Sequence, residues 1–285
     1  MGALLALASA LFYGLSDFLG GVLSRRASFL WVTMVGQIGA LASMALVGPL
    51  VSRTVPEIAD LAWGAVSGIG TGLAMTFLYR GMSRGAMSIV VPVSAVGGVA
   101  MSVLVGVAFL AESPTPLAWS GIVLSVPALW SVSRRPAGEE AWTQGAFSDG
   151  LISSAGIALQ YLALAEAGLE SGIWPVVAGR VTSVVSVAVL GRSLWAGGRG
   201  PSRRVERGAG LLWAAAFAGA LAGVALLCFL LATRTQLVSV AVVLSSLYPV
   251  IPVLLGVTVL RERLGRRQVG GLAAALVATV LITMA

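Results

Sequence analysis

Long apolar runs separated by short polar segments make up most of the chain. As helices, ten of these runs are about as long as the roughly 30 Å hydrocarbon core of a bilayer is thick. Their predicted bounds are 2–23, 30–51, 60–82, 86–110, 116–133, 147–168, 173–195, 209–232, 238–260 and 266–284. In lipid every backbone polar group must be satisfied inside the protein, which favours helices. The pattern therefore predicts an all-α integral membrane protein with ten transmembrane helices.

Two predicted spans, one in each half of the chain, carry residues that disturb a helix. Proline removes a backbone hydrogen bond, and lipid tolerates such a gap only where the backbone is buried in protein or lines a cavity. Broken spans in corresponding positions are typical of a transporter's central site. The predicted hinge residues are Pro92, Gly97, Gly98, Pro249 and Pro252.

Composition agrees with a membrane protein and excludes several other classes. Only 10% of the 285 residues are charged and 58% are hydrophobic, whereas about a quarter of a soluble domain is charged. The net charge is +7, but the basic residues sit in short loops between apolar runs, which indicates lipid contact rather than nucleic-acid binding. The chain has no histidine and one cysteine. Without a metalloprotease motif or a phosphate-binding loop, we expect no enzyme activity, no metal and no cofactor.

The arginines predict the orientation of the chain in the membrane. Fifteen of the 18 follow odd-numbered spans, two follow even-numbered spans, and Arg180 lies inside a span. Cytoplasmic loops carry the excess of basic residues. We therefore expect the loops after odd-numbered spans in the cytoplasm and both termini on the non-cytoplasmic side.

The two halves of the chain resemble each other. At an offset of 150 residues Trp63 matches Trp213, Glu112 matches Glu262 and Gly121 matches Gly271. Five spans per half invert the second half relative to the first, which is an architecture of alternating-access carriers. We expect a first five-helix repeat at 1–135, a cytoplasmic connector at 136–146 and a second repeat at 147–285, integrated into one membrane domain around a central cavity.

This layout resembles the EamA-type carriers of the drug/metabolite transporter superfamily. The resemblance rests on the five-plus-five spans and on a glutamate that closes the fourth span of each half, with a glycine nine residues later (Glu112/Gly121 and Glu262/Gly271). Within the superfamily the chain is similar to the YddG-type aromatic amino-acid exporters of bacteria. The resemblance implies a bacterial cytoplasmic-membrane protein with a cavity lined mainly by spans one, three, four, six, eight and nine.

Span one offers the most conspicuous candidate site, because Ser9, Tyr13 and Asp17 form a polar stripe at helical spacing in an apolar run, with Ser16 beside it. A carboxylate inside a span is costly and usually faces a cavity or a partner. Asp17 could bind a substrate amine or a proton. It could also pair with a cytoplasmic arginine such as Arg25, two turns away, and this pairing is the interpretation we favour.

The other candidates admit a structural interpretation beside the functional one. Gln160 could bind a polar ligand or form an interhelical hydrogen bond, and Phe77 or Tyr79 could stack on an aromatic substrate beside a glycine stripe that packs helices. For Arg180 we expect pairing with Glu166 or Glu170, or a position at the interface, rather than carboxylate binding. Glu112 and Glu262 are expected to tie span ends to neighbouring backbone or arginine. The full predicted substrate-binding set is Tyr13, Ser16, Asp17, Phe77, Tyr79, Ser94, Gln160, Tyr161, Ser245 and Tyr248.

Together these features predict a monomeric carrier that exports small metabolites, aromatic or hydrophobic amino acids first, by alternating access. One alternative is an antiporter of phosphorylated or nucleotide-linked sugars, which would need several buried basic residues. Another is a non-transporting membrane scaffold or lipid-handling protein, which would show a lipid-facing groove instead of a polar cavity.

Overall fold

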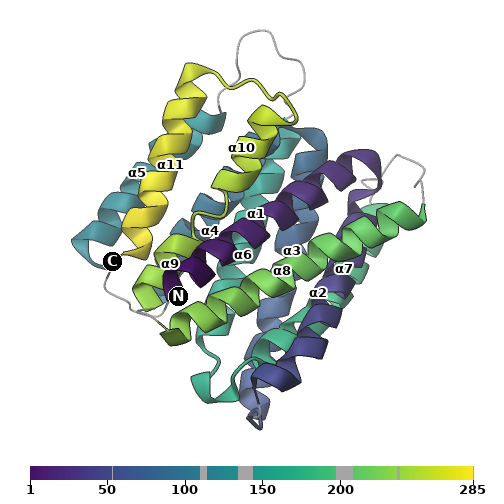
Figure 1. Cartoon of the computed structure of the whole chain (residues 1–285). Coiled ribbons are helices and arrows are strands. Elements are labelled where there is room, and N and C mark those ends of the chain that lie inside the picture. Colours follow the sequence, from purple (N-terminus) through teal and green to yellow (C-terminus); the bar gives the residue numbers. More distant parts are fainter. Residues whose placement is uncertain (53, 110–113, 134–143, 197–207, 236–237, 285) are drawn as a thin grey trace.

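A computed structural model describes residues 1–52, 54–109, 114–133, 144–196, 208–235 and 238–284, and these residues form helices joined by short connections (Figure 1). The helices are α1 (Gly2–Arg26), α2 (Phe29–Val51), α3 (Ile58–Arg84), α4 (Met87–Phe109), α5 (Pro116–Ser133), α6 (Gln144–Ala165), α7 (Trp174–Ala196), α8 (Ala209–Thr235), α9 (Val238–Ser245), α10 (Val250–Thr258) and α11 (Arg266–Thr283), with a short 3₁₀ turn η1 (Leu169–Ser171) before α7. Each predicted span corresponds to one helix, except that the ninth is divided into α9 and α10.

The two predicted interruptions have different outcomes. The span around Pro249 is broken, because α9 ends at Ser245 and α10 begins at Val250. The span around Pro92 is not: α4 continues through it from Met87 to Phe109, so the predicted break there is wrong. Pro92 lies in the second turn of α4, where the missing N–H leaves only one backbone carbonyl without its helical partner.

Six of the described helices are long and apolar enough to cross a membrane by themselves: α1, α2, α3, α4, α7 and α8. Two further apolar segments, Pro116–Val132 and Val243–Thr258, are shorter. Apolar side chains such as Leu46, Leu50 and Trp213 are largely exposed on the outside of the bundle. An apolar exterior of this kind suits contact with lipid rather than water.

The helices pair in a pattern that the two halves share. Helix α3 packs on α6 and α7, while α8 packs on α1 and α2. Helices α5 and α11, the last of each half, lie side by side along one edge of the bundle (Figure 1). Exchanging the halves maps each of these pairs onto another pair of the set or onto itself.

Small residues set the spacing of these pairs. A side chain at Gly64 would overlap the backbone of Pro175, and one at Gly68 would overlap that of Gly179, so α3 and α7 meet nearly backbone to backbone. Gly219 of α8 meets Gly36 of α2 in the same way. The packing role predicted for the glycine stripe of span three is therefore confirmed.

Helix α1 crosses the break between α9 and α10 at Gly14. A Cβ atom there would lie 2.7 Å from the carbonyl oxygen of Tyr248 and 2.9 Å from Cγ1 of Ile251. Ser245, at the end of α9, also donates a hydrogen bond to the Ala6 carbonyl of α1 (3.3 Å). The broken span thus rests directly on α1.

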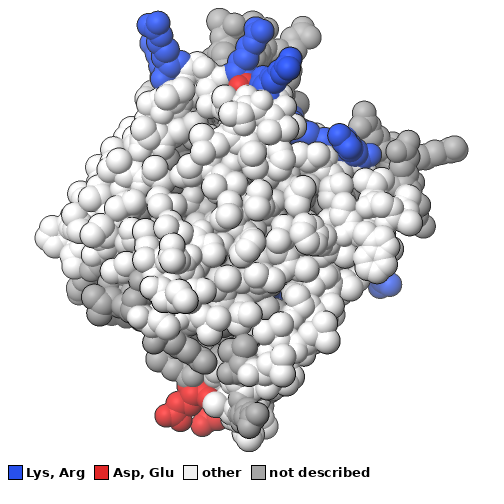
Figure 2. All heavy atoms as spheres, in the orientation of Figure 1, with Lys and Arg blue, Asp and Glu red and all other residues white. Residues whose placement is uncertain are grey.

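Charged side chains separate toward the two ends of the bundle. Most arginine side chains in view lie at one end and a group of exposed carboxylates lies at the other (Figure 2). Arg26 and Arg84 end α1 and α3 and Arg266 begins α11, whereas Glu57 precedes α3 and Glu170 precedes α7.

At the arginine-rich end, one carboxylate joins three segments. Glu262, between α10 and α11, accepts hydrogen bonds from Arg25 Nη2 (2.6 Å), the backbone N–H groups of Met87 and Ser88 (2.9 Å each) and Ser88 Oγ (2.7 Å). Arg25 also donates to the carbonyl of Gly85 (3.0 Å). The structural role predicted for Glu262 is confirmed; Glu112 lies outside the described residues. We call this set of contacts the Glu262 latch.

We expect Gly14→Ala to lower the free energy of unfolding by about 1–3 kcal/mol, because the added methyl group meets a backbone carbonyl that cannot turn away. Gly210→Ala on α8 is the matched control, since nothing lies within 4 Å of a Cβ at that position; it should leave stability unchanged or slightly higher. Thermal unfolding of the purified protein in detergent measures both. Equal stability of the two variants would contradict the close approach of α1 to the break.

We expect Glu262→Gln to destabilise the protein by about 2 kcal/mol at neutral pH, because hydrogen bonds to a charged acceptor are lost. Burial alone would raise the pKa of the Glu262 carboxyl, but hydrogen bonds from Ser88, Arg25 and Met87 outweigh it and hold the pKa below its ordinary value of 4.5. The charged form is therefore the one that stabilises the fold above pH 4.5, and this contribution is lost as the pH falls through the folded-state value. Unfolding measured from pH 3 to 7 should show the two proteins converging at low pH. A constant difference across this range would count against the ionised latch.

Candidate functional site

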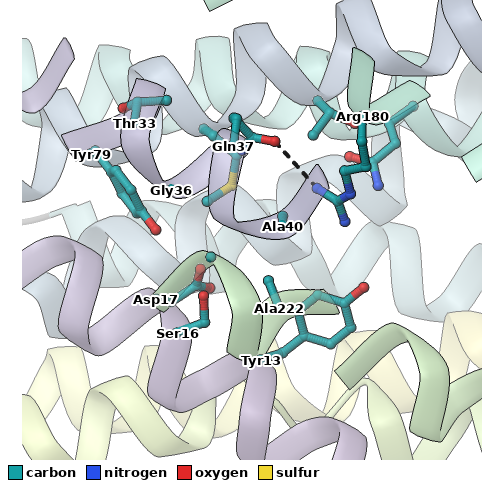
Figure 3. Close-up of a pocket in the computed structure, with 14 residues that line it drawn as sticks. Tyr13, Ser16, Asp17, Thr33, Gly36, Gln37, Ala40, Tyr79, Arg180 and Ala222 are labelled. Atoms are coloured by element: carbon teal, nitrogen blue, oxygen red, sulfur yellow. Dashed lines mark hydrogen bonds between the residues drawn. The ribbon is translucent and has the colours of Figure 1, made fainter. Parts of the chain in front are cut away.

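A small polar pocket lies within the bundle where six helices meet (Figure 3). The space open to a water-sized sphere is about 70 Å³, enough for a few water molecules and well below the roughly 300–1,000 Å³ of pockets that enclose drug-sized ligands. Helices α1, α2, α3, α6, α7 and α8 supply its walls. The lining residues are Tyr13, Ser16, Asp17, Thr33, Gly36, Gln37, Ala40, Thr71, Met75, Tyr79, Gln160, Arg180, Gly219 and Ala222.

The α1 wall carries the predicted polar stripe. Asp17 is 7% exposed, and none of the hydrogen bonds or ion pairs among the described residues includes its carboxylate. The predicted pairing of Asp17 with Arg25 is wrong, because Arg25 instead binds Glu262. Ser16 lines the pocket as well, but its hydroxyl donates to the Ala218 carbonyl of α8 (2.7 Å) and so holds α1 against α8.

Arg180 of α7 lies across the pocket from Asp17 (Figure 3). Its side chain is buried, and Nη1 donates a long hydrogen bond to Oε1 of Gln37 (3.4 Å). The same oxygen accepts a bond from Ser183 Oγ (2.9 Å). We expected Arg180 to pair with Glu166 or Glu170 or to lie at the membrane interface. Instead its side chain is buried against the pocket, and within the described part of the chain it belongs to no ion pair.

Gln37 is a pocket residue that the sequence analysis missed. It is the only glutamine in span 30–51, an otherwise apolar run, and it is 4% exposed. A buried amide in lipid needs partners. That rule could have singled it out from the sequence, although not its contact with Arg180.

Tyr79 and Gln160 complete the predicted residues that reach the pocket. Tyr79 is buried, and its ring packs directly on Gly20 of α1, where a side chain at position 20 would overlap it. Gln160, from α6, lies where α6 and α3 approach at Gly70. The structure therefore brings Tyr13, Ser16, Asp17, Tyr79 and Gln160 together around one cavity.

The tyrosines of the chain lie in the same region as Asp17. The rings of Tyr13 and Tyr248 lie 6.1 Å apart, centroid to centroid, at an angle of 56°. Asp17 lies within electrostatic range of all four tyrosines of the chain, which are Tyr13, Tyr79, Tyr161 and Tyr248. Tyr161 is 47% exposed, so this aromatic group is not fully enclosed by protein.

Three predicted site residues lie elsewhere. Phe77 packs under the guanidinium of Arg80, 4.3 Å from the ring centroid, in a buried cluster where Arg80 Nε donates to Asp149 (2.9 Å). Ser94 bonds Ser153 (2.8 Å) and so joins α4 to α6. Ser245 contacts the α1 backbone, as described above. Each of these three side chains is engaged in a contact between or within helices.

The predicted hinge glycines also serve close packing. A Cβ on Gly98 would lie 2.8 Å from Cβ of Ile157, and one on Gly97 would lie 3.0 Å from Cβ of Ser154. Both neighbours belong to α6. In the structure these glycines allow α4 and α6 to approach, and no irregularity of α4 accompanies them.

The pocket can bind but shows no machinery for covalent chemistry. It offers one carboxylate, one guanidinium, two amides and two tyrosine hydroxyls. Among the residues that the structure describes, no three metal-binding side chains gather at one point. Neighbouring groups of opposite charge with amide donors and acceptors suit recognition of a small polar molecule.

Comparison with known proteins identifies the family. A sequence profile described as the EamA-like transporter family matches residues 1–134 and again residues 151–284. The chain belongs to the EamA-like transporter family. It is therefore a multi-pass membrane protein made of two repeats, in a family of small-molecule transporters rather than enzymes. No curated protein matches the chain.

The fold also has a counterpart among solved structures. A protein known from a crystal structure aligns with 98% of this chain and 95% of its own, at a TM-score of 0.58 and 15% sequence identity. This similarity concerns the fold alone. The family resemblance implied a cavity lined by spans one, three, four, six, eight and nine, but α2 and α7 replace α4 and the broken span in the walls of the pocket found here.

We expect Asp17→Asn to raise the stability of the protein by about 1–3 kcal/mol, because it removes a buried carboxylate without a partner. Asp149→Asn is the contrasting variant. Asp149 pairs with Arg80 and Arg84 and is fully buried, so its loss should cost about 3–5 kcal/mol. Thermal unfolding in detergent at neutral pH compares the two. Destabilisation by Asp17→Asn of similar size would mean that Asp17 has a structural partner.

Proposed function

We propose that the protein is a secondary or facilitative carrier that exports small metabolites by alternating access, with aromatic or hydrophobic amino acids as the first candidates. The pocket carries this proposal, because it places Asp17, Arg180 and two glutamines around one cavity inside the helix bundle. Ionisable groups at such a depth usually mark a transport pathway. The family supports transport of a small molecule, and the tyrosines near Asp17 favour a cargo with an apolar side chain.

Alternating access through an inverted repeat is part of the proposal. The family profile matches each half once, the helix pairs exchange when the halves are exchanged, and five spans per half would place the halves in opposite orientations. In inverted repeats, the bundles rock around a fixed site. The pocket suits that motion because its walls come from three helices of each half.

In this proposal the arginine-rich end is cytoplasmic, as the positive-inside rule predicts. The Glu262 latch would then close the cytoplasmic side, since it ties α1, the start of α4 and the α10–α11 connection together. The α9–α10 break, with Pro249 and Pro252, is the proposed hinge. It adjoins α1 at Gly14, three residues before Asp17.

The rival functions fit the pocket less well. Phosphorylated or nucleotide-linked sugars need several cations, and Arg180 is the single basic residue among the pocket's lining residues. A scaffold or lipid-handling protein has no use for buried unpaired charges, which are costly to keep. Both observations favour a carrier whose small-molecule cargo has either one positive and one negative charge or no charge.

Reconstitution into vesicles tests the carrier function. We expect time-dependent, saturable uptake of labelled tryptophan, and weaker uptake of threonine, because the aromatic group around Asp17 favours a ring. Vesicles with heat-denatured protein are the control. Flux at the level of the control for amino acids, nucleosides and sugars alike would remove the carrier proposal.

A further inference from the structure

We infer that the pocket binds its cargo as a zwitterion, with the cargo's ammonium group against Asp17 and its carboxylate against Arg180. This inference rests on the proposed carrier function and narrows it, because it states which chemical groups every good substrate must carry. It also assigns an orientation: the cargo's side chain points away from both charges.

The α1 side of the pocket fits an ammonium group. Asp17 supplies a buried carboxylate without a hydrogen bond or ion pair among the described residues, and it is the only acidic residue of the pocket lining. The ring of Tyr13 lines the same pocket farther along α1 (Figure 3). A carboxylate together with aromatic faces is a recognised arrangement for a cation.

The α7 side fits a carboxylate. Arg180 has five N–H donors in a planar fork. One of them gives a long bond to Gln37 (3.4 Å), and the guanidinium also interacts with the hydroxyl of Tyr13 on the pocket wall, which leaves further donors for a ligand. Ser183 Oγ donates a hydrogen bond to the same Gln37 oxygen (2.9 Å). Because the Gln37 amide is uncharged, it orients the guanidinium without neutralising its charge. A guanidinium fork matches the two oxygens of a carboxylate.

The separation of the two charges makes a zwitterion the best match. Asp17 and Arg180 face one cavity, yet the ion pairs found among the described residues join other side chains. A ligand with one charge would compensate one buried group and leave the other without a partner, whereas a zwitterion satisfies both. Two separate ions would each lose translational and rotational freedom on binding, whereas a zwitterion loses it once.

The size of the pocket orients the cargo. About 70 Å³ suits a small dipolar head group and not a whole aromatic amino acid. Tyr13 belongs both to the pocket wall and to the ring pair with Tyr248. The cargo's side chain therefore extends along Tyr13 toward Tyr248.

Three ligands that differ only in their charges test the inference: L-tryptophan, tryptamine, which lacks the carboxylate, and indole-3-propionate, which lacks the amine. Binding to the purified protein is measured by calorimetry and by competition with labelled tryptophan. Leucine, isoamylamine and 4-methylpentanoate form a second set for a site that prefers an aliphatic side chain. In the wild-type protein we expect the zwitterion of at least one set to bind 100-fold or more tightly than either single-charge analogue.

The two pocket charges should change this preference in opposite directions. Arg180→Gln should abolish the advantage of tryptophan over tryptamine, and Asp17→Asn should abolish its advantage over indole-3-propionate. Arg192→Gln is the control, because Arg192 lies exposed near the end of the same helix α7; it should bind all three ligands as the wild type does. If Asp17 and Arg180 had only a structural role, each variant would bind all three ligands more weakly, and the order of the three affinities would stay the same.

Several results would overturn the inference. One is equal binding of the amine or the acid to the wild-type protein, and another is the absence of zwitterion binding in both sets. A uniform loss of binding in both variants, with folding verified by a single unfolding transition, would do the same. If Arg180→Gln does not fold, the wild-type comparison of the three ligands decides alone. Vesicle flux of a purely cationic or anionic cargo would leave the carrier function standing and overturn the zwitterion site, whereas selective binding without flux would overturn the carrier.

Discussion

Two buried ionisable side chains, Asp17 and Arg180, belong to no ion pair among the described residues, and they are the constraint on which the remaining structure depends. Two other carboxylates are compensated by opposite charge: Asp149 by Arg80 and Arg84, and Glu262 by Arg25 and by backbone N–H groups. The chain therefore has the means to neutralise charge inside the bundle. At Asp17 and Arg180 it does not use them, and the cost of each buried ion must be offset by the packing of six helices around the pocket.

That packing depends on small residues, because a bundle in lipid gains little from apolar burial and must rely on close contact. Gly36 against Gly219, and Gly68 against Gly179, bring α2, α8, α3 and α7 to nearly backbone distance. The same contacts keep the pocket small. A cavity of about 70 Å³ cannot enclose an aromatic amino acid, so cargo entry in the proposed carrier must separate some of these helices, and interfaces of small residues can slide with little loss of interlocking side chains.

Hydropathy was sufficient to predict the ten spans, since a 20-residue apolar run has few alternatives to a helix in lipid. The proline positions predicted the break at Pro249 correctly, but α4 continues through Pro92 in its second turn, where one helical hydrogen bond is lost without breaking the helix. Within the site, helical spacing grouped Tyr13 and Asp17 correctly because they share one helix. It could not find the pairing of Gln37 with Arg180, because contacts between α2 and α7 depend on how each helix is rotated, and periodicity alone does not fix that rotation. The same limit explains Arg25, whose partner Glu262 is 237 residues away.

Helix α1 connects the three features that a carrier needs. Gly14 contacts the α9–α10 break, Asp17 faces the pocket, and Arg25 takes part in the Glu262 latch. A helix transmits displacement along its length because its backbone hydrogen bonds resist bending. A ligand that draws Asp17 toward the opposite wall must therefore also shift the latch at one end of α1 and the break beside its middle. In the proposed mechanism, compensation of the buried charges would supply the free-energy difference between the two states, since a ligand can shift such an equilibrium only by its differential affinity for them.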